Sequence, residues 1–292
     1  MAPLLVLAND AAGGLDADVR DAVLVTLRAG AEVDTASPDG PDELDAVLAA
    51  HPHHRPVAVG GDGTLHLLVA ALHARGELGD RVVGLVPQGT GNDFAGTLGL
   101  PGDPVAAART VLHGRERALD LLVDDTGAVV VNVVHLGIGA RANREGTPLK
   151  PVLGPLAYPL GALIAGLRSS GWRLRVDVDG RRLADGVVLQ VGIGNGRTFG
   201  GGTPIVPGAV PDDGLADVVV STATGPLARL GYGRLLQAGR QGEHPQVVTA
   251  RGTQIEVSGG PVPVNADGEP GEPVTRRRWT LHPGAWRVTV PG

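Results

Sequence analysis

The sequence contains no cysteine among its 292 residues. This absence excludes disulfide bonds, thiolate metal ligands and a cysteine nucleophile; it leaves the redox compartment open, with a cytoplasmic location as the simplest expectation. Lysine is almost absent too, since only Lys150 occurs and Pro151 follows it. A Walker A loop requires Gly-Lys followed by Ser or Thr, so that route to phosphate binding is excluded.

Aromatic residues are also scarce. Three Trp, two Tyr and two Phe, with a net charge of -6, provide neither the stacking platform nor the basic field that nucleic-acid binding uses. We therefore expect no nucleic-acid partner.

No apolar run is long enough for a bilayer span. The most apolar long window, 155–167, is interrupted by Pro159, Gly161 and Gly166, and falls short of the roughly 20 residues that a span needs. We expect no transmembrane segment, while peripheral contact with the inner face of the membrane and a homodimer both stay open. Arg276-Arg277-Arg278 is equally consistent with binding to anionic headgroups and with a charged, exposed strand edge.

The hydrophobic pattern changes near residue 124. Before that point, short apolar runs such as 4–8 and 82–86 alternate with helical stripes, which predicts a parallel sheet covered by helices on both faces. Beyond it, the alternation at 172–179 and the Asp179-Gly180 turn predict antiparallel hairpins. We expect an α/β domain over residues 1–124 and a mostly antiparallel, β-rich domain over residues 125–292.

Two glycine-rich turns follow neighbouring predicted strands. The first is Gly60-Gly61-Asp62-Gly63-Thr64, and the second, over 87–95, reads Pro-Gln-Gly-Thr-Gly-Asn-Asp-Phe-Ala. Backbone N–H groups at a helix start, unshielded by side chains, form a concave anion site. From the glycines alone, a tight turn without a ligand is equally consistent, and Asn92 or Asp93 taken singly is more typical of a helix N-cap. The presence of Asp62 favours a functional turn over a purely structural one. A carboxylate beside a bound phosphate would repel that phosphate unless the carboxylate bound a metal ion or transferred a proton.

Two acidic turns occur later in the chain. Asp212 and Asp213 are adjacent, so both would be ionised and repelling unless a cation lay nearby. Alone, this pair is more typical of a type I turn ending at Gly214. Asp267-Gly268-Glu269 alone is likewise typical of a solvated turn.

Taken together and in order, these segments resemble the catalytic domain of diacylglycerol kinases and the related soluble bacterial lipid kinases. Sphingosine and ceramide kinases share this domain, and NAD kinases are more distant relatives that share only the first glycine motif. The resemblance covers essentially the whole chain, and it implies a Rossmann-like, NAD-kinase-like α/β domain, a β-sandwich-like second domain, and an active site in the cleft between them. The downstream segments that match are Asn195-Gly196, 200–202, 207–209, 212–215 and 267–269.

The resemblance also implies ATP and Mg²⁺ as cofactors and a role for individual residues. Glu269 corresponds to the general base, and Asp62 to part of an aspartate–water–magnesium network near the transferred phosphate. Nucleotide contacts are implied for Asn9, Thr35, Gly60, Gly61, Asp62, Gly63, Thr64, Leu65, His66, Gly89, Thr90, Asn92 and Asp93, and the magnesium site for Asp213 with the backbone carbonyls of Val210 and Leu215. Many members carry Asn-Glu two residues after Thr64, where this chain has His66-Leu67 and so lacks a carboxylate.

The function implied by the resemblance is that of a lipid kinase. It would transfer the γ-phosphate of ATP to a hydroxyl of a diacylglycerol-like lipid at a membrane surface. A second hypothesis changes the acceptor to a sphingoid base, phosphatidylglycerol or a soluble polyol. A third is a nucleotide-binding regulator without catalysis, which His66-Leu67 favours and the presence of Asp62, Asp213 and Glu269 disfavours.

Overall fold

The computed structural model describes residues 2–8, 17–138, 140 and 170–292. They belong to two compact units, the first formed by residues up to Leu121 together with Pro283–Gly292, the second by Leu122–His282. The sequence predicted a division after residue 124, with everything later in the second domain. The last ten residues, 283–292, belong to the first of the two compact units, and the predicted domain bounds stay a prediction.

A parallel sheet forms the centre of the first unit. Its strand order is β2-β1-β3-β4, and every pairing in it is parallel. β1, β3 and β4 are almost entirely buried, as expected of continuous apolar strands that carry helices on both faces. The elements are β1 (Leu4–Ala8), α1 (Ala17–Arg28), β2 (Val33–Ala36), α2 (Pro41–Ala50), β3 (Arg55–Gly60), α3 (Asp62–Ala74), β4 (Gly84–Pro87), α4 (Asp93–Leu98), α5 (Pro104–His113) and β5 (Arg115–Asp124).

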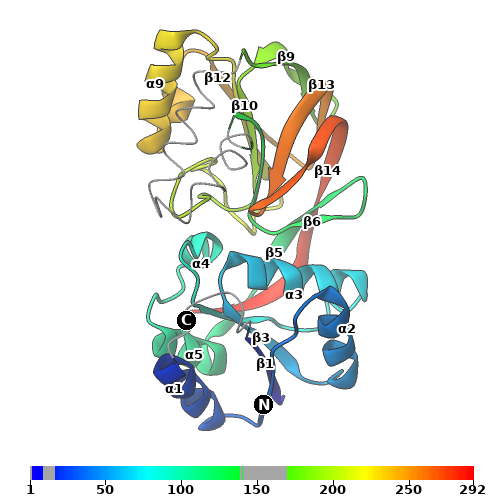
Figure 1. Ribbon diagram of the computed structural model, residues 1–292, viewed down its shortest axis with the longest axis vertical. Coiled ribbons are helices and arrows are strands. Elements are labelled where there is room, and N and C mark those ends of the chain that lie inside the picture. The colour runs from blue at the N-terminus through cyan, green and yellow to red at the C-terminus, as the bar shows by residue number, and fades with distance from the viewer. Residues whose placement is uncertain (1, 9–16, 139, 141–169) are drawn as a thin grey trace. The chain divides into compact units, whose positions relative to one another are not determined.

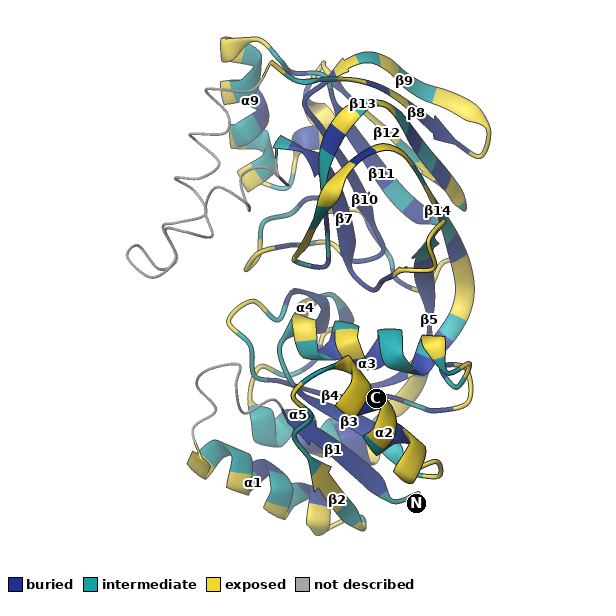
Figure 2. Ribbon diagram, turned by 45° about the vertical axis from the view of Figure 1, so that its right-hand side comes forward, coloured by how far each residue is buried: buried dark blue, intermediate teal, exposed yellow. Residues whose placement is uncertain are grey.

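Helices cover both faces of this sheet (Figures 1 and 2). α1 and α5 pack on one face through Val23, Leu27 and Val111, while α2 and α3 lie on the other face. The start of α5 is capped, because the Asp103 carboxylate accepts the N–H of Ala106 at 2.7 Å and Pro104 opens the helix.

Gly114 ends α5 without a left-handed cap. Its φ is -71°, which any residue adopts. Glycine is required there for close approach instead, since a Cβ would lie 2.4 Å from the Val290 carbonyl oxygen. The chain end therefore packs directly against the end of α5.

The second unit is built on an antiparallel sheet of ten strands, ordered β12-β11-β10-β7-β13-β14-β5-β6, with β8 and β9 attached to β13. A large core of aliphatic residues around Trp279 lies within it, and a smaller core around Phe199 and Tyr232 lies beneath α9. The predicted fold class, a parallel α/β unit followed by a mostly antiparallel β unit, is confirmed. The elements are β6 (Val129–Val130), β7 (Val133–Gly137), β8 (Trp172–Val178), β9 (Arg181–Val188), β10 (Gln190–Gly194), β11 (Ala216–Ser221), α9 (Pro226–Gln237), η4 (Gln241–Glu243), β12 (Val247–Gly252), β13 (Gln254–Ala266) and β14 (Glu269–Val290).

No helix among the described residues is long and apolar enough to cross a bilayer.

Candidate active site

The two glycine turns touch each other through their backbones. β3 and β4 are neighbours in the parallel sheet, so the turns that follow them meet at the same edge. A Cβ on Gly89 would lie 2.5 Å from the Cα of Gly61, and a Cβ on Gly61 would lie 3.1 Å from the Cα of Gly89. A side chain at Gly60 would collide with Thr64, 2.3 Å from its Oγ1. These glycines are therefore required by close packing, whatever ligand the turns bind.

Asp62 links the two turns. Its carboxylate oxygens accept the backbone N–H groups of Asp93 and Phe94, both at 3.0 Å. Those groups open α4, so Asp62 supplies the cap of a helix that lies about thirty residues further along the chain, at |i−j| of 31 and 32. The cap carries a negative charge at the positive end of the helix, which is the favourable arrangement.

Asn92 and Asp93 do not serve as side-chain caps. Asn92 is left-handed, with φ 51°, and its amide bonds twice to Gly89, accepting the Gly89 N–H at 2.8 Å and donating to the Gly89 carbonyl at 2.7 Å. Asp93 is buried in the first turn of α4. Both residues thus shape the second turn.

Several backbone N–H groups at the two turns are left without an acceptor. The N–H groups of Gly61, Thr90 and Gly91 have no acceptor among the residues that the structure describes. Thr90 and Gly91 are exposed, so these donors are open to an anion. Clustered backbone amide groups in turns that lead into helices, as these turns lead into α3 and α4, bind phosphate oxygens in other proteins.

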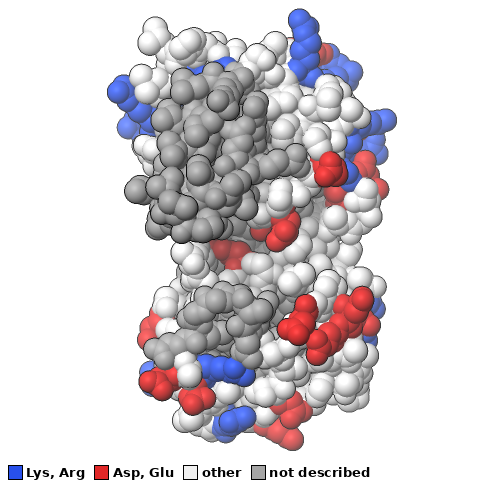
Figure 3. Space-filling model, in the orientation of Figure 1, with Lys and Arg blue, Asp and Glu red and all other residues white. Residues whose placement is uncertain are grey.

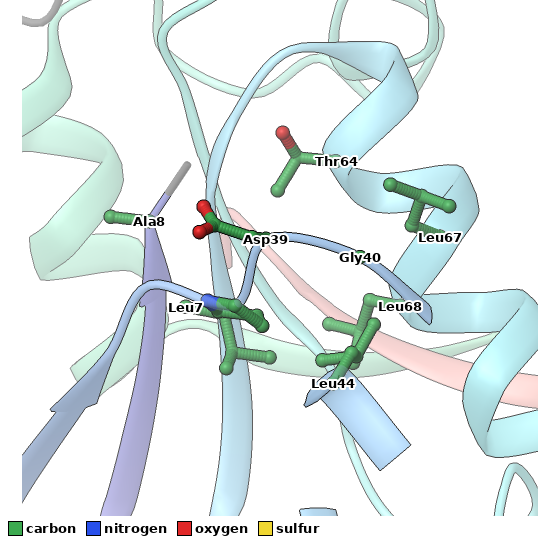
Figure 4. A pocket seen from close by; sticks show the side chains of 9 residues that line it. Leu7, Ala8, Asp39, Gly40, Leu44, Thr64, Leu67 and Leu68 are labelled. Atoms are coloured by element: carbon green, nitrogen blue, oxygen red, sulfur yellow. The ribbon is translucent and has the colours of Figure 1, made fainter. Parts of the chain in front are cut away.

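The other predicted nucleotide contacts surround this cluster. Thr64 lines a cavity beside the first turn of α3 (Figure 4), whereas Thr35, on β2, lines a smaller cavity on the opposite face of the sheet. Leu65 is a buried core residue and His66 is partly exposed. Asn9 lies outside the described residues.

Asp267 and Glu269 belong to the second unit. Asp267 is left-handed, with φ 50°, and forms the tight turn between β13 and β14 with Gly268. Its carboxylate accepts three backbone N–H groups, from Val131 at 2.6 Å, Asn132 at 2.9 Å and Val133 at 3.0 Å. Glu269 is exposed, as the first residue of β14. The buried aspartate therefore anchors the turn, and the exposed glutamate is presented from it.

The predicted magnesium site contains an arginine. One carboxylate oxygen of Asp213 accepts the Leu215 N–H at 3.1 Å, and the other pairs with the Arg251 guanidinium. Arg251 also reaches Asp217 at 3.2 Å; burial raises the pKa of Asp217, and Arg251 opposes that shift. Each carboxylate oxygen of Asp213 thus has a protein partner, and the magnesium site at Asp213, Val210 and Leu215 stays a prediction. The described residues contain no cluster of three or more His, Asp or Glu side chains suited to a metal ion.

One buried titratable residue, a histidine, was not predicted from the sequence. His135, on β7, is fully buried, packs edge-on against Phe199 with ring centroids 4.4 Å apart, and neither ring nitrogen has a hydrogen-bond partner. Burial lowers the pKa of His135 to about 4, so the ring is neutral at physiological pH. A single histidine in an apolar strand carries no periodic signal that distinguishes this environment.

Comparison with known proteins gives the same class of protein as the fold and the turns. Residues 3–123 match the diacylglycerol kinase catalytic domain, and residues 132–290 match the YegS C-terminal NAD kinase beta sandwich-like domain. The fold resembles that of a diacylglycerol kinase from Bacillus anthracis, with a TM-score of 0.81 at 21% identity, covering 99% of this chain and 97% of that one.

Relatives of similar sequence indicate which family within this class of kinases the chain belongs to. A protein of Xanthomonas oryzae, named a probable lipid kinase and YegS-like, is 35% identical over 94% of this chain and 92% of its own length. One of Pseudomonas aeruginosa with the same name is 36% identical over 99% of this chain and 94% of its own length. The chain belongs to the YegS-like family of diacylglycerol kinase-related lipid kinases. The family resemblance expected from the motifs is therefore confirmed.

Proposed function

We propose that this protein transfers the γ-phosphoryl group of ATP to a hydroxyl of a diacylglycerol-like lipid. The observation that carries the proposal is the cluster of unpaired N–H groups at Gly61, Thr90 and Gly91, fixed by the backbone contact between the two turns. Phosphoryl transfer depends mainly on positioning and charge neutralisation, which such donors supply. The product would be a phosphatidic-acid-like phospholipid.

Each remaining residue has one proposed task. Asp62 holds the two turns in register and lies beside the bound phosphates. Glu269 accepts the hydroxyl proton while the acceptor oxygen bonds to Pγ, the bond from Pγ to the β–γ bridging oxygen breaks, and ADP leaves. Mg²⁺ bound together with ATP would supply neutralisation of phosphate charge, and Asp62 is the residue that the family resemblance places beside it. Glu269 suits the base because it is an exposed carboxylate on a turn that Asp267 keeps rigid.

The test is transfer of labelled γ-phosphate into organic-extractable product, with mixed micelles of diacylglycerol, sphingoid base or phosphatidylglycerol as acceptors. We expect label in diacylglycerol and a loss of about 100-fold or more in kcat for Glu269→Gln, the range for removal of a general base. Glu272→Gln, three residues along the same strand and also exposed, is the matched control. Label found only in another lipid or in glycerol would show that this molecule, and not diacylglycerol, is the acceptor. ATP binding without any phosphoryl transfer would favour a nucleotide-binding regulator without catalysis.

We also propose that this protein is cytoplasmic and docks at the inner face of the membrane through α9. Leu227 and Leu230 are 86% and 54% exposed on one side of this helix, and the exposed Arg234 lies a turn further along. Figure 2 shows the exposed stretches of α9, and Figure 3 shows basic side chains along its outer edge.

The triple arginine is a weaker candidate for this contact. Arg276 and Arg278 pair with Glu256, while Arg277 pairs with Asp124, and β14 is an inner strand between β13 and β5. Sedimentation with phosphatidylglycerol vesicles tests the assignment. We expect the pair Leu227→Ser and Leu230→Ser to lose most binding, and Val25→Ser, an equally exposed apolar position on α1, to keep it.

A further inference from the structure

A fully buried asparagine lies beside the turn that presents Glu269. Asn265 is the residue before the last one of β13, and none of its surface is exposed. It pairs with His135 of β7 on one side and with Pro270 of β14 on the other, so it lies on the middle one of three adjacent strands (Figure 2). Asparagine is mostly exposed in folded proteins, and a buried one is usually held by hydrogen bonds, so the bonds of this side chain indicate its task.

The side chain of Asn265 bonds to the turn itself. Its Oδ1 accepts the N–H of Gly268 at 3.1 Å. The N–H of Asp267, the other residue of the turn, donates to the Val133 carbonyl at 3.0 Å. The turn has positive φ at both positions, 50° at Asp267 and 100° at Gly268, as in the two-residue turns that close hairpins. Both of its N–H groups are held by the protein, so Glu269 leaves the turn from a fixed backbone.

The other end of this amide has no such partner. Asn265 Nδ2 is buried without an acceptor among the described residues, and neither ring nitrogen of the facing His135 has a partner there. The bond to Gly268 fixes this orientation, because the reverse one would direct Nδ2 at the Gly268 N–H, donor against donor. A buried donor without an acceptor costs free energy, which an aliphatic residue would avoid. An amide kept at this cost indicates a task other than stability.

We infer that Asn265 is a positioning residue for Glu269: by holding the Gly268 N–H, it fixes the carboxylate that accepts the hydroxyl proton. The inference rests on the proposed function. Asp267 anchors the turn to the backbone at the start of β7, and Asn265 holds the same turn from β13. A base must meet the hydroxyl within hydrogen-bond distance, and a displacement of about 1 Å can cost up to about 100-fold in rate. Fixing the turn therefore raises the rate of proton transfer.

Two substitutions separate positioning from stability. Asn265→Leu removes the Oδ1 acceptor together with the donor that has no partner, whereas Asn265→Asp keeps an oxygen for the Gly268 N–H but buries a charge. We expect Asn265→Leu to lower kcat about tenfold at unchanged KM, while its unfolding midpoint stays at or above that of the wild type. We expect Asn265→Asp to keep kcat within about threefold while its unfolding midpoint falls. A purely structural asparagine would make kcat follow stability in both variants.

Gln241→Leu is the matched control. Gln241 is another fully buried amide of the second unit, and its Nε2 donates to the carbonyl oxygens of Pro204 and Ile205 at 2.6 and 2.9 Å, not to the turn. Its replacement leaves two carbonyl groups without their donor. We therefore expect a lower unfolding midpoint and a wild-type kcat at temperatures where the variant is folded.

The effect of Asn265 should also require Glu269. In the Glu269→Gln protein, the further change Asn265→Leu should alter single-turnover transfer by less than about twofold, since a residue that acts through the base then has nothing left to position. Asn265→Ala, which removes the same acceptor, repeats each comparison if the leucine variant does not fold.

The outcomes distinguish the positioning role from the proposed function. A wild-type kcat in Asn265→Leu, an equal loss of kcat in the folded Asn265→Asp protein, or a tenfold further loss in the Glu269→Gln background would overturn the positioning role and leave the kinase proposal standing. If the wild-type protein transfers phosphate to none of the acceptors, the proposed function fails and the positioning role fails with it.

Discussion

The two units differ in whether their clustered backbone N–H groups have acceptors within the protein. In the first unit, glycines bring two turns together and leave the N–H groups of Gly61, Thr90 and Gly91 without acceptors. In the second unit, a comparable group of three N–H groups at Val131, Asn132 and Val133 is filled by the Asp267 carboxylate. An amide cluster that the protein fills with its own carboxylate is structural, and one that it leaves open is available to a ligand.

The carboxylates of the three acidic motifs, at Asp62, Asp213 and 267–269, follow the same division. The carboxylates of Asp62 and Asp267 both accept hydrogen bonds from backbone N–H groups, and that of Asp213 pairs with Arg251. Glu269, two residues after Asp267, is left exposed. We therefore expect the first three carboxylates to contribute to stability, and the exposure of Glu269 supports its proposed role in proton transfer.

Adding a methyl group where the two turns touch should have the largest effect. Gly89→Ala places a Cβ 2.5 Å from the Gly61 Cα, a backbone atom that cannot rotate away. We expect a loss of about 3 kcal/mol or more in unfolding free energy, the upper range for overpacking, measured by urea denaturation of the first unit's transition. Gly96→Ala, which meets nothing within 4 Å, is the control and should be neutral or stabilising. Equal stability of the two variants would break the account of the turns.

Removing the charge of Asp267 should have the next largest effect. Asp267→Asn keeps the left-handed turn but replaces a carboxylate that accepts three buried N–H groups. We expect a loss of about 3 kcal/mol, because hydrogen bonds to charged groups contribute about 1.5–3 kcal/mol each and the amide oxygen retains some of them. Asp62→Asn, with two N–H groups at stake, should lose less. The reverse order would contradict the comparison.

The buried His135 should make the stability of the second unit depend on pH. Its pKa is lowered to about 4 from 6.5, so the unfolded chain binds a proton in the interval between those values and the folded chain does not. Stability should therefore be full above pH 6.5 and fall by about 2 kcal/mol on going from pH 7 to pH 5, by proton linkage. Unfolding curves at both pH values check this. His135→Leu should flatten the slope, and the same change at the exposed His53 should leave it intact.

The smallest effect concerns magnesium. Because Arg251 already neutralises Asp213, addition of Mg²⁺ without nucleotide should shift the wild-type melting temperature by less than about 1 °C, and Arg251→Gln should cost less than about 1 kcal/mol, as for other partly exposed ion pairs. The variant should then gain stability on addition of Mg²⁺. A shift of several degrees in the wild-type protein would show that the cation site is real.

Periodicity and motif order were enough to predict the two-unit architecture, the parallel sheet and both glycine turns. They did not predict that Asp62 caps α4 or that Asp267 anchors β7, since each bond joins segments far apart in sequence, at |i−j| of 31 and 134 in the examples of Asp93 and Val133. The Arg251 contact with Asp213 was missed for the same reason, at |i−j| of 38. Local pattern identifies which residues have the right chemistry, whereas long-range pairing decides whether a carboxylate remains available.

Single-turnover phosphoryl transfer, with ATP binding measured on the same samples, tests the proposed role of Glu269 as the base. We expect Glu269→Gln to bind ATP within about twofold of wild type, since no bond to ATP is lost, while transfer to diacylglycerol falls by about 100-fold or more. A Glu269→Gln protein that transfers phosphate at the wild-type rate would contradict the division between structural and reacting carboxylates.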